Sequence, residues 1–270
     1  VGYVWSRPVC LPRVWLDVSR AFAVLHLPRR RQRQLCIGAR PHSCGALLAR
    51  RRTNGAAMGT LLAVEGLHAL EGEAAHVDTL VDDGYRMMSL THMHDNALGG
   101  ASTGLDKGGL TDYGAAVVDR LVARNVTIDL AHASEALIDD VLARTRGPVV
   151  VSHTGVRATC DSPRNLSDRH IKAVAARGGV IGVGLWETAV CGTGPAAVAA
   201  SMRHVADLVG VEHVALGTDF DGTVSVPFDA TGFPLLTEAL LAEGFSPRDI
   251  EQIMGANVVR VLRQSLPPAE

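Results

Sequence analysis

Five ionisable residues stand at the ends of apolar, strand-like stretches of this 270-residue sequence. Glu65 closes LLAVE, His92 follows SLT, His132 follows TIDLA, His153 closes VVVSH and Asp219 follows VALGT. Packing and a backbone hydrogen bond would explain any one of these histidines. Five such residues together indicate a site, because two imidazoles and a carboxylate that converge bind divalent transition metals, zinc among them. A remaining strand-end aspartate suits proton transfer to or from a metal-bound water.

The elements that must position these residues alternate along the chain from residue 58 onward. Apolar β-type stretches alternate with amphipathic patterns of ten to fifteen residues, which predicts βαβ units, a parallel sheet and an α/β fold. In a (β/α)₈ barrel the carboxyl ends of the strands face the active site, and six strands make up most of such a barrel. The predicted strands are LLAVE (61–65), YRMMSLT (85–91), VTIDLA (126–131), PVVVSH (148–153), GVIGVGL (179–185) and EHVALGT (212–218).

Capping residues mark the starts of several helices. Ser134 precedes EALIDDVLAR, and Ser167 precedes DRHIKAVAAR. Ser246 and Pro247 open RDIEQIMGANVVRVL, with serine at the cap and proline at the first helical position.

Residues 1–57 form an Arg-rich segment that does not join this pattern. They contain eleven arginines, no lysine and one acid, Asp17, so their charge is near +10 while the remainder is near −12. We therefore divide the chain into this segment and a partial barrel domain, 58–270. A transit peptide, a solvated tail and a sequence foreign to the fold are all open, and arginine runs without lysine favour the last. Nucleic-acid binding is not expected, because aromatic residues and a known module are lacking.

Cysteine usage and hydropathy bear on the compartment. The cysteines are odd in number and have no C-x-x-C spacing, so we expect free thiols in a reducing, cytoplasmic setting. No apolar run approaches the roughly 18 residues of a membrane span. The end, RQSLPPAE, offers no hydrophobic tail for a lipid anchor. The five cysteines are Cys10, Cys36, Cys44, Cys160 and Cys191.

The motifs resemble, in order, those of the membrane (renal-type) dipeptidases, the M19 metallopeptidases of the amidohydrolase superfamily. The resemblance runs from about Met58 to Leu262 and implies a TIM-like barrel that hydrolyses dipeptides with two zinc ions. The six predicted strands would be the third to eighth of that barrel. The motifs are LLAVEGLHAL, SLTHMHDN, KGGLTDYG, TIDLAHAS, VVVSHTG, SPRNLSD and HVALGTDFDG.

The resemblance also implies roles for the strand-end residues. Glu65 would bridge both metals, and His132 and His153 would complete the ligands of one of them. Asp219 would transfer the proton. His92 would polarise the scissile carbonyl or stabilise the oxyanion that forms from it.

The sequence also predicts the positions or roles of other polar residues in the motifs. Arg164 of SPRN would bind the substrate carboxylate, a task that suits a guanidinium group. Asp221 is expected to be a turn residue, and His94 and Asp95 to shape the pocket. The ligand-like HVD at 76–78 lies in a helical pattern, so we exclude it. Cys160 and Cys191 need no role beyond packing. Surface positions are expected for His68, His76, His170, His204 and His213.

One family motif is missing. The family binds its other metal with an H-x-D pair well before the bridging glutamate, whereas only His26 and His42 precede Glu65 here. We therefore expect one zinc rather than two, and an incomplete barrel whose first and last recognisable strands are edges. The rival hypothesis is a truncated, catalytically impaired barrel that binds at most one metal. The expected partner is a dipeptide, and the oligomeric state, including a homodimer, stays open.

Overall fold

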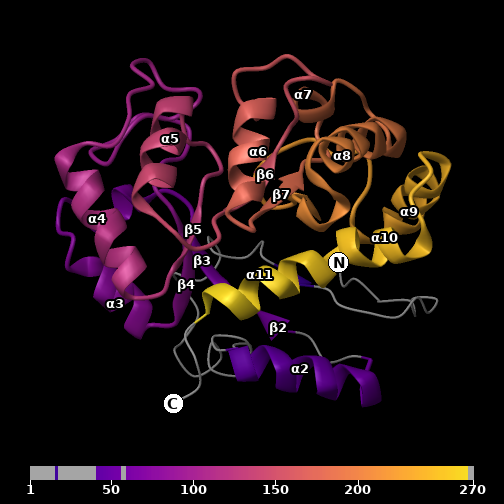
Figure 1. Ribbon diagram of the computed structural model, residues 1–270, viewed down its shortest axis with the longest axis horizontal. Helices are drawn as coiled ribbons and strands as arrows, with labels where there is room; N and C mark the ends of the chain where they lie inside the picture. The colour runs from indigo at the N-terminus through magenta and orange to yellow at the C-terminus, as the bar shows by residue number, and fades with distance from the viewer. Residues whose placement is uncertain (1–15, 18–40, 56–58, 267–270) are drawn as a thin grey trace, which may run out of the picture.

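A curved sheet of six parallel strands organises the protein (Figure 1). The structure is a computed structural model that describes residues 16–17, 41–55 and 59–266. The strands are neighbours in the order in which they occur in the sequence. This confirms the predicted parallel α/β architecture. The strands are β3 (Leu62–Val64), β4 (Tyr85–Ser89), β5 (Thr127–Asp129), β6 (Val150–Thr154), β7 (Val180–Val183) and β8 (Val214–Leu216). Each predicted stretch overlaps one observed strand, and only β6 extends past its predicted end, by one residue.

Helices connect the strands and cover the outer face of the sheet. The connecting helices are α3 (His76–Asp82), α4 (Asp112–Ala123), α5 (Glu135–Arg144), α6 (Asp168–Ala176), α7 (Glu187–Val190) and α8 (Pro195–Val209). Short 3₁₀ helices are η2 (Leu67–Leu70), η3 (Val211–His213) and η4 (Ala230–Gly232). In the part of the chain that the structure describes, no helix is long and apolar enough to cross a membrane.

Side chains on the two faces of the sheet enter different cores, as the period of two along a strand requires. Met88, Ile128, Ile181 and Val214 pack against the connecting helices in the larger cluster. The alternate residues belong to a second cluster on the inner face, together with residues of the C-terminal helix α11 (Asn257–Ser265) and beyond. That inner cluster comprises Leu61, Met87, Val150, Val180, Ala215, Val261, Leu262 and Leu266.

The inner face of the sheet is thus covered by α11. Ser265 of this helix also bonds Thr127 of β5, with 2.8 Å between the two hydroxyl oxygens. β3 and β8 are the two ends of the six-stranded sheet, and neither pairs with the other in the described segments. In the described segments the structure is therefore the expected incomplete barrel with two edge strands. The helix α11 packs against its inner face.

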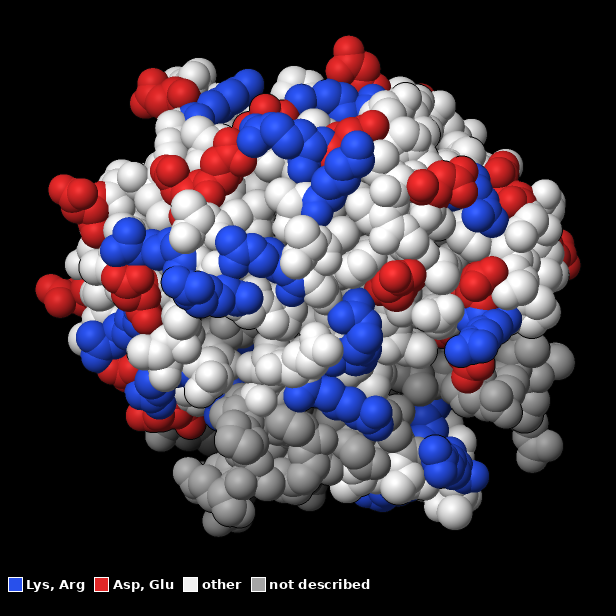
Figure 2. Space-filling view, viewed as in Figure 1, with Lys and Arg blue, Asp and Glu red and all other residues white. Residues whose placement is uncertain are grey.

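The Arg-rich segment contains two described elements that the sequence did not predict. The helix α2 (Pro41–Thr53) contacts α11, and Leu47 of α2 is buried. β1 (Leu16–Asp17) pairs in parallel with β2 (Gly59–Thr60) in a separate two-stranded sheet. Basic side chains are visible over the region of α2 at the bottom of Figure 2.

Ion pairs connect successive helices around the outside, where acidic and basic side chains lie close together (Figure 2). Each pair is exposed, so each contributes little to stability on its own. Together they connect α3 to α4, α4 to α5 and α5 to α6 through Asp82 and Arg124 at 2.7 Å, Asp119 and Arg144 at 2.7 Å, and Asp139 and Arg169 at 2.6 Å.

One helical stretch is interrupted, and one expectation about histidines was wrong. The helical stretch after Ser246 consists of α10 (Pro247–Glu251), a π-helical turn (Gln252–Ala256) and α11. Ser246 does cap α10, through a capping box with Asp249. His170, expected on the surface, is fully buried on α6, where Ser167 and Asp139 contact its two ring nitrogens at 2.9 and 3.2 Å.

The expectation of free thiols was wrong for two cysteines. Cys160, in the loop after β6, forms a disulfide with Cys191 at the end of α7, 31 residues away. Buried Asn165 connects the same two segments, since its amide nitrogen donates to the carbonyl oxygens of Cys160 and Ala189 at 2.8 and 3.0 Å. Arg164 lies in the loop between Cys160 and Asn165, so the disulfide restrains the loop that carries this arginine. The side chains of Cys10, Cys36 and Cys44 lie outside what the structure describes.

We predict that the double variant Cys160→Ala with Cys191→Ala loses about 3–4 kcal/mol of unfolding free energy, the chain-entropy value for a loop of this length. Urea denaturation followed by circular dichroism measures the loss. Reductant should destabilise the wild-type chain by a similar amount and leave the double variant unchanged. Equal stability of the two proteins without reductant would contradict the prediction.

Candidate metal centre

Glu65 reaches the site because the chain turns sharply directly after β3. Gly66 has φ 86° in this turn, and a Cβ there would lie 2.8 Å from the His68 ring. The Gly66 N–H donates to the hydroxyl of buried Ser89, at the end of β4, over 2.8 Å. The turn and this bond together direct the Glu65 side chain across the carboxyl edge of the sheet.

His132 follows β5 in a left-handed backbone conformation, with φ 64°. Such a conformation is unfavourable for a residue with a Cβ and persists only where neighbouring contacts hold it. Here the Ser102 N–H donates to the His132 carbonyl oxygen over 2.7 Å, and the Ala133 N–H donates to that of Leu130 over 3.2 Å. The loop thereby turns the buried imidazole back over the strand ends.

His153 lies near the end of β6, buried among polar and aromatic neighbours. Its Nδ1 atom is 2.9 Å from the hydroxyl of Ser152. The ring of Trp186 stands edge-to-face against it with 6.0 Å between centroids. These two contacts fix the ring so that Nε2 faces Glu65.

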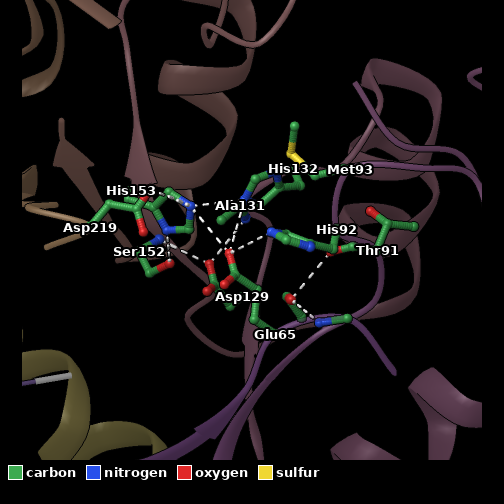
Figure 3. Close-up of polar contacts among 12 residues, drawn as sticks. Glu65, Thr91, His92, Met93, Asp129, Ala131, His132, Ser152, His153 and Asp219 are labelled. Carbon is green, nitrogen blue, oxygen red and sulfur yellow. Dashed lines mark hydrogen bonds and ion pairs between the residues drawn. The ribbon is translucent and has the colours of Figure 1, made fainter. Parts of the chain in front are cut away.

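Three imidazoles converge on one carboxylate oxygen (Figure 3). Glu65 Oε1 lies 2.9 Å from His132 Nε2, 3.3 Å from His153 Nε2 and 3.9 Å from His92 Nε2. The Nε2 atoms of His132 and His153 are 2.9 Å apart. The structure therefore brings together the ligand set expected from the sequence, and it brings His92 to the same place.

The ionisation of these groups suits metal binding. Burial raises the pKa of Glu65, but the contact with His132 and the nearby imidazoles outweigh it and lower the pKa to about 2. Burial lowers the pKa of His132 to about 4 and that of His153 to about 3. At neutral pH the site holds a carboxylate and neutral imidazoles, the forms that ligate metals.

The donor set fits a divalent transition metal. Glu65 Oε1 is buried and, within the described ranges, has no hydrogen bond of good geometry despite its three imidazole neighbours. A cation between these atoms would satisfy the oxygen and the Nε2 lone pairs together. Nitrogen ligands of one zinc ion lie roughly 3–3.5 Å apart at tetrahedral angles, close to the spacings seen here. Glu65, His92 and His132 each offer a ligand atom within 4.8 Å of the others.

Asp219 stands beside this cluster, after β8. Its Oδ2 is 3.9 Å from His153 Nε2, and the side chain is 15% exposed. Burial, and then the negative charge of Glu65, raise the pKa of Asp219 to about 6, against the opposing charge of Arg164. A carboxyl group with a pKa near the working pH can both accept and return a proton. Asp221 lies exposed in the following turn, as expected.

Arg164 reaches the cluster from the disulfide-restrained loop. Its Nη2 donates to the His153 carbonyl oxygen over 3.0 Å. Burial lowers the pKa of Arg164 to about 10, partly offset by Asp129, Glu65 and Asp219, so the group stays charged at neutral pH. Beside it, a cavity of about 360 Å³ has His132 and Arg164 in its wall.

Other polar residues of the motifs lie around the cluster. Asp95 shapes the adjoining loop, since its carboxylate accepts the N–H groups of Ala101 and Asp106 at 2.7 and 2.8 Å. His94 is exposed, and residues 76–78 are helical, as expected. Asp129, a buried acid at the end of β5, was not predicted from the sequence. Its place within TIDLA, three residues before His132, was the available clue.

Comparisons with known proteins agree with this geometry. Residues 41–267 match the family model described as membrane dipeptidase, peptidase family M19. Dipeptidase verJ of Clonostachys rogersoniana is 34% identical over 210 residues, 75% of this chain and 54% of that protein. Dipeptidase aclJ of Aspergillus oryzae is 34% identical over 213 residues, 75% of this chain and 50% of that protein. The chain therefore spans about half the length of these curated relatives.

Solved structures share the fold. The probable dipeptidase PvdM from Pseudomonas aeruginosa has a TM-score of 0.78 at 21% identity, with 87% of this chain and 76% of that chain covered. A metallo peptidase from Rhodobacter sphaeroides, liganded with a phosphinate mimic of L-Ala-D-Ala, has a TM-score of 0.76 at 23% identity, with coverages of 85% and 68%. These likenesses agree with the TIM-like barrel expected from the sequence.

We predict that the double variant His132→Ala with His153→Ala loses binding of a divalent transition metal, because two of the clustered imidazoles are gone. Equilibrium dialysis against Zn²⁺ measures the binding. His204→Ala is the matched control, since His204 bonds Asp168 away from the cluster. Full zinc binding by the double variant would show that the ligands lie elsewhere.

Proposed function

Because the chain belongs to peptidase family M19, the membrane dipeptidases, we propose that it hydrolyses dipeptides with zinc held by Glu65, His132 and His153. The observation that carries the proposal is the convergence of the imidazole Nε2 atoms on Glu65 Oε1, with Asp219 beside them. The names of the relatives support the dipeptide as the substrate class.

When bound, zinc supplies Lewis acidity, which lowers the pKa of a water ligand toward 7 and polarises a carbonyl group. The remaining work falls to side chains of this chain. Asp219 takes the proton from the attacking water and returns it to the leaving amine, for which a pKa near 6 is well placed.

Two further residues orient the substrate in this proposal. His92 is partly exposed at the edge of the cluster, so its imidazole can bond the oxygen of the scissile carbonyl as negative charge develops there. Arg164 retains N–H groups beyond the one that bonds His153, and these bind the free carboxylate of the dipeptide. The scissile bond is thereby placed between the carboxylate anchor and Asp219.

We predict that the purified chain binds close to one zinc ion, since no H-x-D pair precedes Glu65 in this sequence. Elemental analysis of dialysed protein measures the ratio, and two tightly held zinc ions per chain would contradict it. One ion without turnover of any dipeptide would favour the rival hypothesis of a one-metal binding protein.

We predict that Asp219→Asn lowers kcat for a dipeptide by at least about 100-fold, because the amide keeps the shape but cannot carry the proton. Amine release, followed with ninhydrin, measures the rate. In the wild type, kcat/KM should fall as pH drops below about 6, where Asp219 becomes protonated and can no longer accept. This decrease in kcat/KM at low pH, the acid limb of the profile, should be absent from Asp219→Asn.

Asp221→Asn is the matched control, since this acid lies two residues away in the exposed turn. It should keep most of the activity and the acid limb. If Asp221→Asn lost more activity than Asp219→Asn, the proton-transfer role would belong to Asp221.

A further inference from the structure

Asp129 is a buried carboxylate that the proposed chemistry does not use. It is the last residue of β5, it is 6% exposed, and burial raises its pKa. An acid in such a place is costly unless hydrogen bonds compensate for the lost water. Its bonds therefore indicate what it does.

The first bond spans the gap between β5 and β6. These strands have one register pair, Asp129 with Val150, followed by the Leu130 N–H donating to the Val150 carbonyl oxygen over 2.8 Å. Beyond that point the Ser152 N–H donates to Asp129 Oδ1 over 2.9 Å. A side-chain oxygen has replaced the backbone acceptor, so the two strands remain tied where they separate.

The second bond runs to the loop before His132. The same Oδ1 atom accepts the Ala131 N–H over 3.0 Å. Ala131 precedes the left-handed His132, and Ser152 precedes His153. One carboxylate oxygen thus fixes the backbone directly ahead of both histidines, whose Nε2 atoms are 2.9 Å apart.

The third contact orients the ring of His153. Its Nδ1 atom is 2.9 Å from the hydroxyl oxygen of Ser152 (Figure 3). Ligation of a metal through Nε2 requires the hydrogen on Nδ1, and that N–H then donates to the Ser152 oxygen. The residue whose N–H group bonds Asp129 thus also supports the His153 ring.

We propose that Asp129 is a positioning residue that sets the spacing of His132 and His153 and, through Ser152, the orientation of the His153 ring. The inference rests on the proposed zinc centre and adds to it the residue on which its two histidines depend.

Zinc affinity of the full chain, measured by competition with a chelating dye, tests this role. Asp129→Ala should raise the Kd for zinc about 10–100-fold, the usual effect of losing a residue that orients ligands. Asp129→Asn keeps an oxygen for both N–H groups, so it should stay within about threefold of the wild type. Ser152→Ala keeps the backbone bond but removes the hydroxyl, and it should raise the Kd at least about threefold. Ser152→Ala carries the test if Asp129→Ala does not fold.

A control variant is needed to distinguish a specific effect on zinc affinity from a general loss of stability. A buried residue with similar hydrogen bonds, but far from the cluster, serves this purpose. Asn257 is 2% exposed, and its amide donates to the carbonyl oxygens of Val211 and Val214, both at 2.8 Å. Asn257→Ala should lower the Tm without changing the Kd more than about threefold.

Hydrogen exchange of the zinc-free chain reports the same bonds without metal. Peptides that contain Ala131 and Ser152 should exchange faster in Asp129→Ala than in the wild type. If exchange is unchanged in Asp129→Ala, the positioning role is wrong. The same holds if the wild type binds zinc and either Asp129→Ala or Ser152→Ala has the same Kd. An equal rise in Kd for Asn257→Ala would also contradict the positioning role. These outcomes leave the proposed zinc centre itself intact. A wild-type chain that binds no zinc would overturn the proposed centre and this inference with it.

Discussion

Curvature of the six-stranded sheet is the constraint on which the site depends. Glu65 leaves β3 and His153 belongs to β6, three strands away, a separation of about 14 Å in a flat sheet. Their side-chain atoms nevertheless lie 3.3 Å apart. Asp219, from the other end of the sheet, lies beside His153. The helices outside and α11 inside stabilise this curvature, so packing far from the polar cluster governs its geometry.

Close approach of strand ends also requires that neighbouring strands separate at the right point. Backbone pairing between β5 and β6 stops early, and polar side chains take over from the ladder there. Buried polar networks of this kind are stable only when every member has a partner. His132 Nδ1 departs from that rule, since no partner contacts it in the described part of the chain. The site thus combines a well-bonded His153 with a less constrained His132.

The strands and the strand-end ligands could be predicted because the information is local. A short apolar stretch that ends in Glu65 or His153 indicates both the strand and the edge at which the side chain lies. Contacts between distant segments could not be predicted in this way. The partner of Cys160 is 31 residues away, and nothing in the spacing distinguishes Cys191 from the other cysteines. The sequence around His170 is typical of a surface histidine. Its burial depends on a contact with Asp139 of the preceding helix, which the local sequence does not reveal. The helix α2 lacks an apolar stripe, so periodicity gave no indication of it.

The position of α11 has a consequence for the order in which the protein can fold during synthesis. Met87 of β4 emerges from the ribosome early, whereas Val261 and Leu262, which cover the same face, come about 175 residues later. At about 5–20 residues per second this interval is on the order of ten seconds or more. During that time the concave face of the nascent sheet has no cover from its own helix. An early termination of translation, or a slow stretch of codons before residue 257, would therefore prolong exposure of an apolar surface to chaperones and to other nascent chains.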